Sequence, residues 1–251
     1  MKKEYYRFNK EGHKHEILVD GVWKSLTGCT TILSVLAKPA LIKWAVGVSV
    51  DYIRDEIDKT INENLFVLPN LIDKLPFIYD NARKEHENKK NKAGNFGTEL
   101  HKLIEDYIKK GNEVLLFGNN DLKVAYGNFI KWAKDNKVKF LEAEKNVYSK
   151  KLFIGGIIDI ICEIDGQVWL VDLKTSNSGI WPENFAQMAG YQIMLQDMKL
   201  YPEITGYIVL NLKKNGEFMD KRSVSNEDNK KFFLACLEIY RQQERIKNQI
   251  L

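Results

Sequence analysis

The chain has 251 residues, of which 44% are hydrophobic and 29% are charged. This length and composition fit one large folded domain, or a core with a helical annex, and argue against an intrinsically disordered chain. The formal net charge of +4 fits a polyanionic partner but also an ordinary solvated surface, so charge alone selects no function.

Cysteine usage and hydropathy narrow the class of protein. Cys29, Cys162 and Cys236 are scattered and form no CxxC pair, which argues against a disulfide framework and against a zinc site. No apolar segment follows the basic N-terminus, and no apolar run approaches the roughly 18 residues that a membrane-spanning helix needs. We therefore expect an intracellular, cytoplasmic protein without a membrane partner.

The hydrophobic pattern changes from helical to strand-like along the chain. The elements predicted in order are a strand over 15–19 in a small hairpin, helices within 29–58 with Pro39 starting the second, a helix over 98–110 that ends at Gly111, a helix over 121–135, strands over 142–148, 153–164 and 168–175, a helix over 182–198, a strand over 206–212 and a helix over 227–247. This order predicts an α/β fold.

Other parts of the chain are less regular. The polar segment 81–92 is either an exposed helix face or a mobile arm. The strand over 153–164 is expected to be loosened at Gly155-Gly156, and His13 and His15 are interpreted as surface residues.

Each strand of the hairpin around residue 165 contains an acid. Asp159 lies in the run 157–161, whose other members are all isoleucine. Asp172 and Lys174 are two residues apart near the end of the partner strand, so they project from one face. With a two-residue turn at Asp165-Gly166, the strand register places Asp159 directly opposite Asp172.

Two carboxylates this close repel each other unless a cation lies between them. A divalent metal that prefers oxygen ligands, Mg²⁺ or Mn²⁺, suits such a pair. Simpler interpretations exist for each residue, because Asp159 could pair with a buried Lys or Arg, and Asp172 and Lys174 could form a plain ion pair. The combination on paired strands favours the metal site.

These residues resemble the motifs of the PD-(D/E)XK nuclease superfamily. The segments 156–159 (GIID) and 172–175 (DLKT) resemble its core motif on two strands. The segment 187–191 (QMAGY) on the next helix resembles the QxxxY motif of the RecB-like branch, and 97–101 (GTELH) resembles its GxxxH motif. The helical segment 38–45 is similar to that of phage-type exonucleases in this group.

The resemblance implies a restriction-endonuclease-like core, a mixed central sheet flanked by helices, with an N-terminal helical region. We expect residues 1–93 to form the N-terminal hairpin and helical region, packed on a nuclease core of residues 94–251 in one compact unit. The resemblance also implies His101, Asp159 and Asp172 as metal ligands, together with the backbone carbonyl of Leu173.

The remaining site residues follow from the same resemblance. Lys174 would orient or deprotonate the attacking water and stabilise the developing charge. Gln187 and Tyr191 would hold the active site together and contact the nucleic-acid backbone. Glu105, one helical turn after His101, and Glu144, on a strand, are further candidate acids of the site.

The implied function is a Mg²⁺- or Mn²⁺-dependent deoxyribonuclease, an exonuclease acting on ends or single strands in recombination, repair or phage DNA processing. A phage-encoded enzyme acting in the host cytoplasm fits this description. DNA is favoured over RNA as partner, and recombination or replication proteins are candidate partners. The scattered cysteines predict no iron–sulfur cluster. The alternative is a non-catalytic nucleic-acid-binding subunit of a recombination complex with the same fold.

Overall fold

The computed structural model describes residues 5–9, 12, 14–63, 67–111, 120–176, 179–224 and 226–250. The chain divides into two compact units, the first made of Met1–Leu36 and Gly97–Leu251 and the second of Ala37–Phe96. The expected boundary near residue 93 lies close to the end of the second unit. The first 36 residues, however, group with the core, because one of their strands pairs with a core strand.

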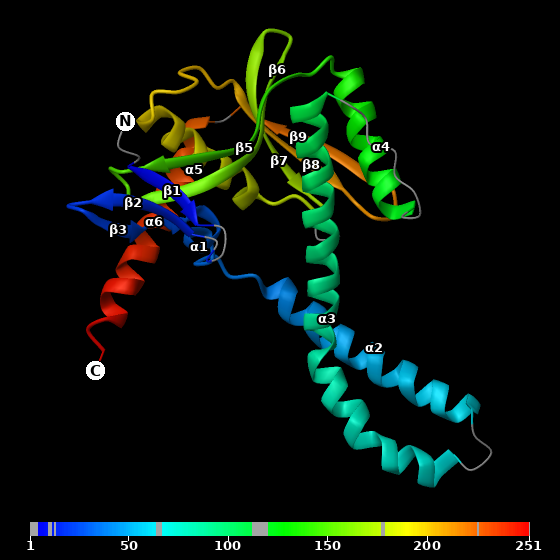
Figure 1. Ribbon diagram of the computed structural model, residues 1–251. Helices are drawn as coiled ribbons and strands as arrows, with labels where there is room; N and C mark the ends of the chain where they lie inside the picture. The colour runs from blue at the N-terminus through cyan, green and yellow to red at the C-terminus, as the bar shows by residue number, and fades with distance from the viewer. Residues whose placement is uncertain are drawn as a thin grey trace. The chain divides into compact units, whose positions relative to one another are not determined.

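The described residues of the first unit form two sheets and four complete helices (Figure 1). Its strands are β1 (Tyr6–Asn9), β2 (Lys14–Val19), β3 (Val22–Ser25), β4 (Thr27–Gly28), β5 (Lys139–Ser149), β6 (Ile154–Ile164), β7 (Gln167–Lys174), β8 (Gly206–Leu212) and β9 (Phe218–Ser223). Its helices are α1 (Cys29–Leu33), α4 (Asn120–Asp135), α5 (Pro182–Asp197) and α6 (Asn226–Lys247).

The larger sheet is mixed. Its strand order is β4-β6-β7-β8-β9, with β5 paired to β6. The β7–β8 and β4–β6 pairs are parallel, whereas β5–β6, β6–β7 and β8–β9 are antiparallel. The predicted α/β class, with a mixed central sheet flanked by helices, is confirmed. The smaller sheet, β1-β2-β3, is antiparallel throughout.

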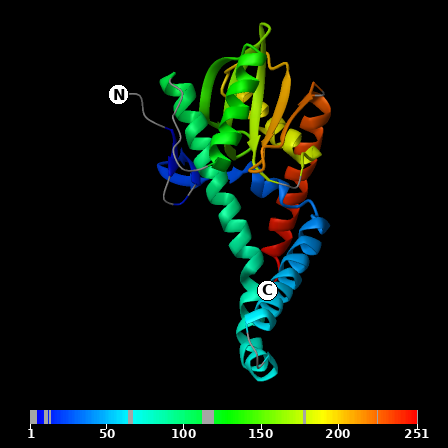
Figure 2. The same cartoon turned by 90° about the vertical axis from the view of Figure 1, so that its right-hand side faces the viewer.

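Helices cover both faces of the larger sheet (Figure 2). Leu170 of β7 belongs to a buried cluster with Ala189 of α5, and α1 and α6 pack against α5 on this side. On the other face, Trp132 of α4 donates a hydrogen bond to Asp220 of β9 at 2.8 Å. Burying each large apolar side chain of these layers stabilises the fold by about 1.5–3 kcal/mol.

The hairpin that carries the predicted acids forms as expected. Asp165 and Gly166 have φ of 51° and 77°, the positive values that a two-residue type I′ turn requires. Ile164 pairs with Gln167, and the pairing continues in register as far as Ile160 and Val171. Strand β9, which the sequence pattern did not predict, extends the sheet beyond β8.

The two glycines at the start of β6 have a packing role. The strand runs through Gly155 and Gly156 without interruption, so the expected loosening is wrong. A Cβ atom on Gly155 would lie 2.6 Å from Cβ of His15, and one on Gly156 would overlap the ring of Tyr191. Both positions therefore need glycine because neighbouring side chains approach the backbone closely.

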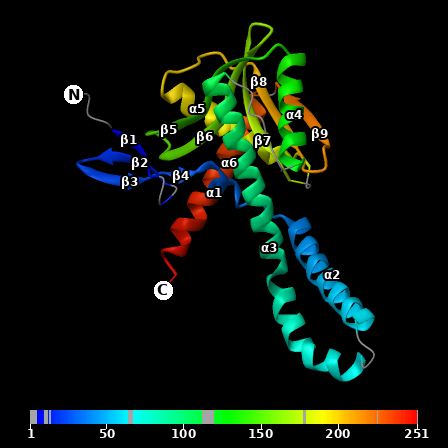
Figure 3. The ribbon, with the colours of Figure 1, turned by 45° about the vertical axis from the view of Figure 1, so that its right-hand side comes forward.

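The second unit is a pair of helices, drawn in blue and cyan in Figure 3. They are α2 (Pro39–Glu63) and the part of α3 (Val67–Lys110) that ends at Phe96. Ser49 of α2 donates a hydrogen bond to the carbonyl of Ala82 of α3 at 2.9 Å. Pro39 begins α2 as predicted, and segment 81–92 is helical rather than an irregular arm. No helix among the described residues is long and apolar enough to cross a membrane.

We predict opposite stability effects for two glycine-to-alanine substitutions. Gly156→Ala must displace the Tyr191 ring and should destabilise the protein by about 1–3 kcal/mol. Gly127→Ala, on the exposed side of α4 with nothing in the described chain within 4 Å of the added Cβ, should stabilise it by about 0.5–1 kcal/mol. Urea unfolding followed by circular dichroism measures both. Equal effects of the two substitutions would contradict the close packing of Tyr191.

Candidate metal centre

The site lies where β6 changes its strand partner. Over Ile160–Ile164, β6 pairs with β7, whereas Ile154 and Gly155 pair with β4. Asp159 falls just beyond the last β6–β7 pair, and one of its carboxylate oxygens, Oδ2, accepts a hydrogen bond from the amide of Leu173 at 2.7 Å. The predicted register is therefore correct up to Ile160. Beyond it, the Asp159 side chain takes the place of a backbone acceptor, which separates the two strands.

Asp172 and Lys174 form a buried ion pair at the end of β7. Only 3% of Asp172 is exposed, and Lys174 Nζ lies 2.7 Å from its Oδ1 and 2.6 Å from its Oδ2. The angles satisfy a hydrogen bond to Oδ1, whereas Oδ2 accepts none within the described chain. A buried carboxylate oxygen that accepts no hydrogen bond has lone pairs that can interact with a cation, here the ammonium of Lys174.

His101 enters the site from α3, in the part of that helix that belongs to the first unit. Its Nδ1 atom lies 3.5 Å from Asp159 Oδ1 and 3.8 Å from Glu144 Oε1. The neighbouring residues Leu100 and Ile104 are almost completely buried, which fixes the rotation of the helix about its axis. His101, Glu144 and Asp159 each offer one ligand atom, and these atoms all lie within 4.8 Å of one another.

Glu144 has an unusual backbone conformation for a strand residue. It lies in β5 between Ala143, which pairs with Ile160, and Lys145, which pairs with Ile158, and is therefore opposite Asp159. Its φ is 51°, in the left-handed region that non-glycine residues rarely adopt. Such a conformation costs about 1–3 kcal/mol, and it is found preferentially where function needs a particular side-chain direction.

The electrostatics of the site are those of two anions held by two cations. Burial raises the pKa values of Asp159 and Asp172, and the positive charges of His101 and Lys174 oppose that rise. Burial alone would lower the pKa of His101, but the Asp159 and Glu144 carboxylates raise it to about 9. Burial would also lower the pKa of Lys174, which its two aspartate neighbours raise above its usual value.

These residues fit a hard divalent cation. Carboxylate oxygens from Asp159 and Glu144, with one imidazole nitrogen from His101, are donors that Mg²⁺ and Mn²⁺ accept. The ligand atoms of His101, Glu144 and Asp159, all within 4.8 Å of one another, support this fit on structural grounds. Asp172, predicted as a ligand, is not part of this close group among the described residues and pairs with Lys174 instead. The amide of Leu173 donates to Asp159, and the role predicted for the carbonyl of Leu173 stays a prediction.

Gln187 and Tyr191 lie one turn apart on α5 and are in direct contact. Gln187 Nε2 donates a hydrogen bond to the Tyr191 hydroxyl at 2.6 Å. Burial raises the pKa of Tyr191 well above its usual value, and the nearby charges of Asp159 and Asp172 add to the effect. This hydroxyl therefore stays protonated and can donate a hydrogen bond into the site.

Glu105 has its contacts elsewhere on α3. Its carboxylate accepts hydrogen bonds from Lys102 at 2.9 Å and from Lys109 at 2.6 Å, which are helical ion pairs one turn apart. Of the two additional acids that the sequence suggested, the structure brings Glu144 and not Glu105 next to His101 and Asp159. The sequence pattern did not distinguish the two acids, because it does not predict the left-handed backbone conformation of Glu144.

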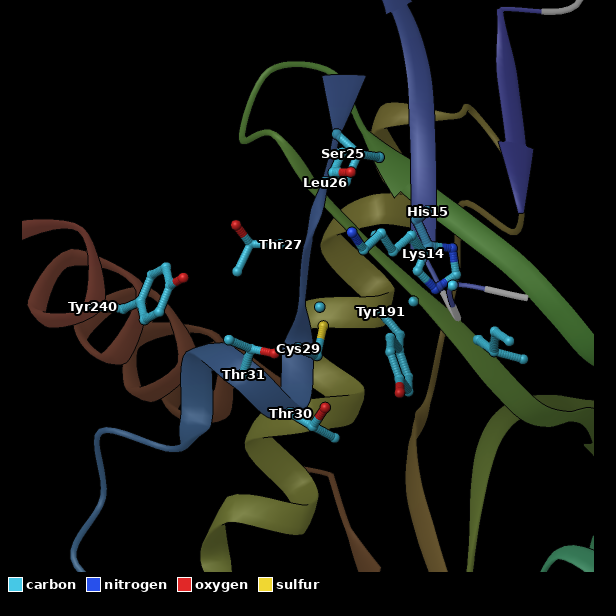
Figure 4. Close-up of a pocket in the computed structure, with 15 residues that line it drawn as sticks. Lys14, His15, Ser25, Leu26, Thr27, Cys29, Thr30, Thr31, Tyr191 and Tyr240 are labelled. Atoms are coloured by element: carbon cyan, nitrogen blue, oxygen red, sulfur yellow. The ribbon is translucent and has the colours of Figure 1, made fainter. Parts of the chain in front are cut away.

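A cavity of about 560 Å³ lies beside the site (Figure 4). Figure 4 shows Lys14 and His15 from the small sheet, Thr30 and Thr31 from α1, and Tyr191 from α5 around it. Ile157, two residues before Asp159, also lines it. His15 is 8% exposed and its Nδ1 lies 2.7 Å from the Tyr6 hydroxyl, so its interpretation as a surface residue is wrong. His13 lies outside the described residues.

Comparisons with known proteins yield only distant likenesses. No family model matches the chain, and no curated protein matches it. The structure is similar to the crystal structure of SSO0001, with 13% identity and a TM-score of 0.31 over 48% of this chain and 57% of that one. It is also similar to an alkaline exonuclease from Laribacter hongkongensis, with 10% identity and a TM-score of 0.30 over 61% and 86% of the two chains. At these TM-scores neither likeness identifies a function.

We predict that His101 of the metal-free protein titrates with a pKa of about 9, and that Glu144→Gln lowers this pKa by removing a facing carboxylate. Because the folded-state pKa exceeds the reference value of 6.5, the His101 contribution to stability is complete below about pH 6.5 and is lost as pH rises through about 9. NMR of the imidazole resonances, with His101→Gln for assignment, measures the pKa. Glu105→Gln is the matched control and should leave it unchanged. A wild-type value near 6.5 would remove His101 from the charged cluster.

Proposed function

We propose that the protein is a metal-dependent nuclease that hydrolyses phosphodiester bonds. The observation that carries this proposal is the junction of β6 and β7, where Asp159 lies close to His101 and Glu144 and where the Asp172–Lys174 ion pair ends β7. The order β5-β6-β7-α5-β8 around this junction also agrees with the restriction-endonuclease-like core that the sequence motifs imply. A structural ion pair would account for Asp172 and Lys174 alone, but not for the convergence of His101, Glu144 and Asp159 beside them.

The residues divide the chemistry between them. When bound, a divalent cation would supply Lewis acidity and a water of lowered pKa. Asp159, Asp172 and His101 would hold it, with Glu144 as a further ligand or as acceptor for a water. The ammonium of Lys174 would orient the attacking water and stabilise negative charge that develops on the phosphoryl oxygens. Tyr191, positioned by Gln187, would donate a hydrogen bond to the nucleic-acid backbone.

We propose DNA as the substrate and an exonucleolytic mode of action on ends or single strands. The cavity beside Ile157 supports this mode, because it is large enough for part of a nucleotide and is lined by Lys14 and by the hydroxyls of Thr30 and Thr31. Recombination, repair or phage DNA processing would be the context, with recombination or replication proteins as candidate partners. Mg²⁺ and Mn²⁺ are the proposed cofactors.

We predict that Mg²⁺ and Mn²⁺ stabilise the protein against heat. A cation that binds only the folded site at one hundred times its Kd contributes about 2.7 kcal/mol, which corresponds to a Tm increase of roughly 5–10 °C for a chain of this size. Asp159→Asn should remove most of this increase. Glu163→Gln, on the same strand and paired with Lys139 instead, should retain it. An equal metal response in both variants would show that the cation binds elsewhere.

We predict metal-dependent degradation of end-labelled linear DNA, abolished by EDTA and sparing closed circular DNA. Lys174→Met and Asp172→Asn should reduce kcat/KM by at least roughly 10²–10³-fold, the usual effect of removing a group that stabilises transition-state charge. Lys139→Met and Glu163→Gln are the matched controls, because they alter an exposed ion pair between β5 and β6 away from the site.

The outcomes of this experiment separate the alternatives. Cleavage of circular as well as linear DNA would keep the nuclease and reject the exonuclease. Cleavage of RNA alone would reject DNA as the substrate. If wild type and site variants bind DNA equally and none cleaves it, the chain is a non-catalytic binding subunit, which is the second candidate function.

A further inference from the structure

Besides the charged residues of the site, one buried amide side chain lies in the same sheet. Asn211 belongs to β8, whose other residues are apolar or aromatic, and it is completely buried. In the parallel β7–β8 pair, Asn211 is the register partner of Lys174, as Val209 is of Asp172. Directly paired residues project from the same face of a sheet, so Asn211 shares the face that carries Asp172 and Lys174.

The amide group of Asn211 contacts the chain where it leaves β7. Its Nδ2 atom donates a hydrogen bond to the carbonyl of Ser176 at 3.0 Å. Ser176 is two residues beyond Lys174, at the start of the connection from β7 to α5. The hydrogen bond therefore fixes the backbone just after the lysine, at a point where the β7 ladder has ended.

The same short segment also lies close to α3. A Cβ atom on Gly97 would lie 3.1 Å from the hydroxyl oxygen of Thr175, so helix and segment are in close contact there. Gly97 is one helical turn before His101 on α3. The two residues that follow Lys174 therefore lie close to the helix that carries His101 and to the strand that carries Asn211.

The cost of Asn211 indicates that it does not serve stability. Its Oδ1 atom is buried and accepts no hydrogen bond within the described chain. A buried acceptor in this condition costs about 1–3 kcal/mol, which offsets the gain of about 1 kcal/mol from the Nδ2 bond. A leucine has the same branching and number of heavy atoms and has no buried acceptor to satisfy. A residue that is costly for stability and adjacent to a proposed site is a candidate for a functional role.

We propose that Asn211 is a positioning residue of the nuclease site, which holds the Thr175–Ser176 segment and through it the placement of Lys174 relative to Asp159 and His101. This inference rests on the proposed function. Asn211 contacts neither the cation nor the substrate, so it acts only through the residues that it positions. Its loss should lower kcat because the lysine is misplaced, and should leave KM and metal affinity almost unchanged.

The test compares four substitutions in the full chain, assayed on end-labelled DNA with Mg²⁺. Asn211→Leu removes the donor and keeps the branching and the number of heavy atoms, and should lower kcat at least tenfold while KM stays within about twofold. Asn211→Ala and Asn211→Ser differ by one hydroxyl, and Ser should recover part of the kcat that Ala loses. Asn226→Leu is the matched control, because Asn226 Nδ2 donates to the carbonyl of Ile204 and its Oδ1 likewise accepts no hydrogen bond in the described chain.

Three further measurements distinguish a local effect on the position of Lys174 from a general loss of stability of the protein. Thermal unfolding should place Asn211→Leu close to wild type or above it, and Mn²⁺ titration should give an unchanged Kd. Hydrogen–deuterium exchange should become faster at the amides of residues 174–176 in Asn211→Leu and not in Asn226→Leu. A wild-type kcat in Asn211→Leu, or an equal loss in Asn226→Leu, would overturn the proposal. An inactive wild type would refute the proposed function instead, and the exchange measurement would then still report whether Asn211 holds the segment.

Discussion

The structure depends on placing two carboxylates in the interior where β6 separates from β7. Ionised acids at such a position lose hydration at a cost of several kcal/mol each, which only close positive charges, hydrogen bonds or a cation can offset. The protein supplies part of this compensation: the Leu173 amide and the His101 imidazolium for Asp159, and the Lys174 ammonium for Asp172. The end of the β6–β7 pairing at Ile160 leaves the Leu173 amide to donate to the Asp159 carboxylate.

Three elements around the site contribute contacts or side chains that maintain this arrangement. Strand β8 supports β7 in parallel register and contributes Asn211, α5 brings Tyr191 against Gly156, and α3 brings His101. Two of these contributions are costly in local terms, namely the left-handed conformation of Glu144 and the buried Oδ1 atom of Asn211, which accepts no hydrogen bond in the described chain. Costs of this kind, concentrated in one place, are expected where selection acts on a site rather than on stability alone.

The sequence predicted the parts of the site that depend on local rules. Alternation placed Asp172 and Lys174 on one face, and the Asp165-Gly166 turn fixed the register that brings Asp159 to the same end of the hairpin. It could not predict that pairing ends at Ile160, because that depends on β4, which comes from more than 120 residues earlier in the chain. It also overlooked Asn211, although a lone polar residue in the apolar segment GYIVLNL is the same kind of signal that identified Asp159.

The two counter-charges of the site have different relationships to a bound cation. Lys174 Nζ lies within 2.7 Å of both carboxylate oxygens of Asp172, so a cation held by that carboxylate would compete for the same lone pairs. His101 must be neutral to act as a ligand, and with a pKa of about 9 it is protonated at neutral pH in the metal-free protein. Cation binding would therefore release a proton from His101 and weaken the hold of Asp172 on Lys174. With the cation bound, the ammonium of Lys174 would be available to a phosphate. The segment held by Asn211 would limit how far that ammonium can move.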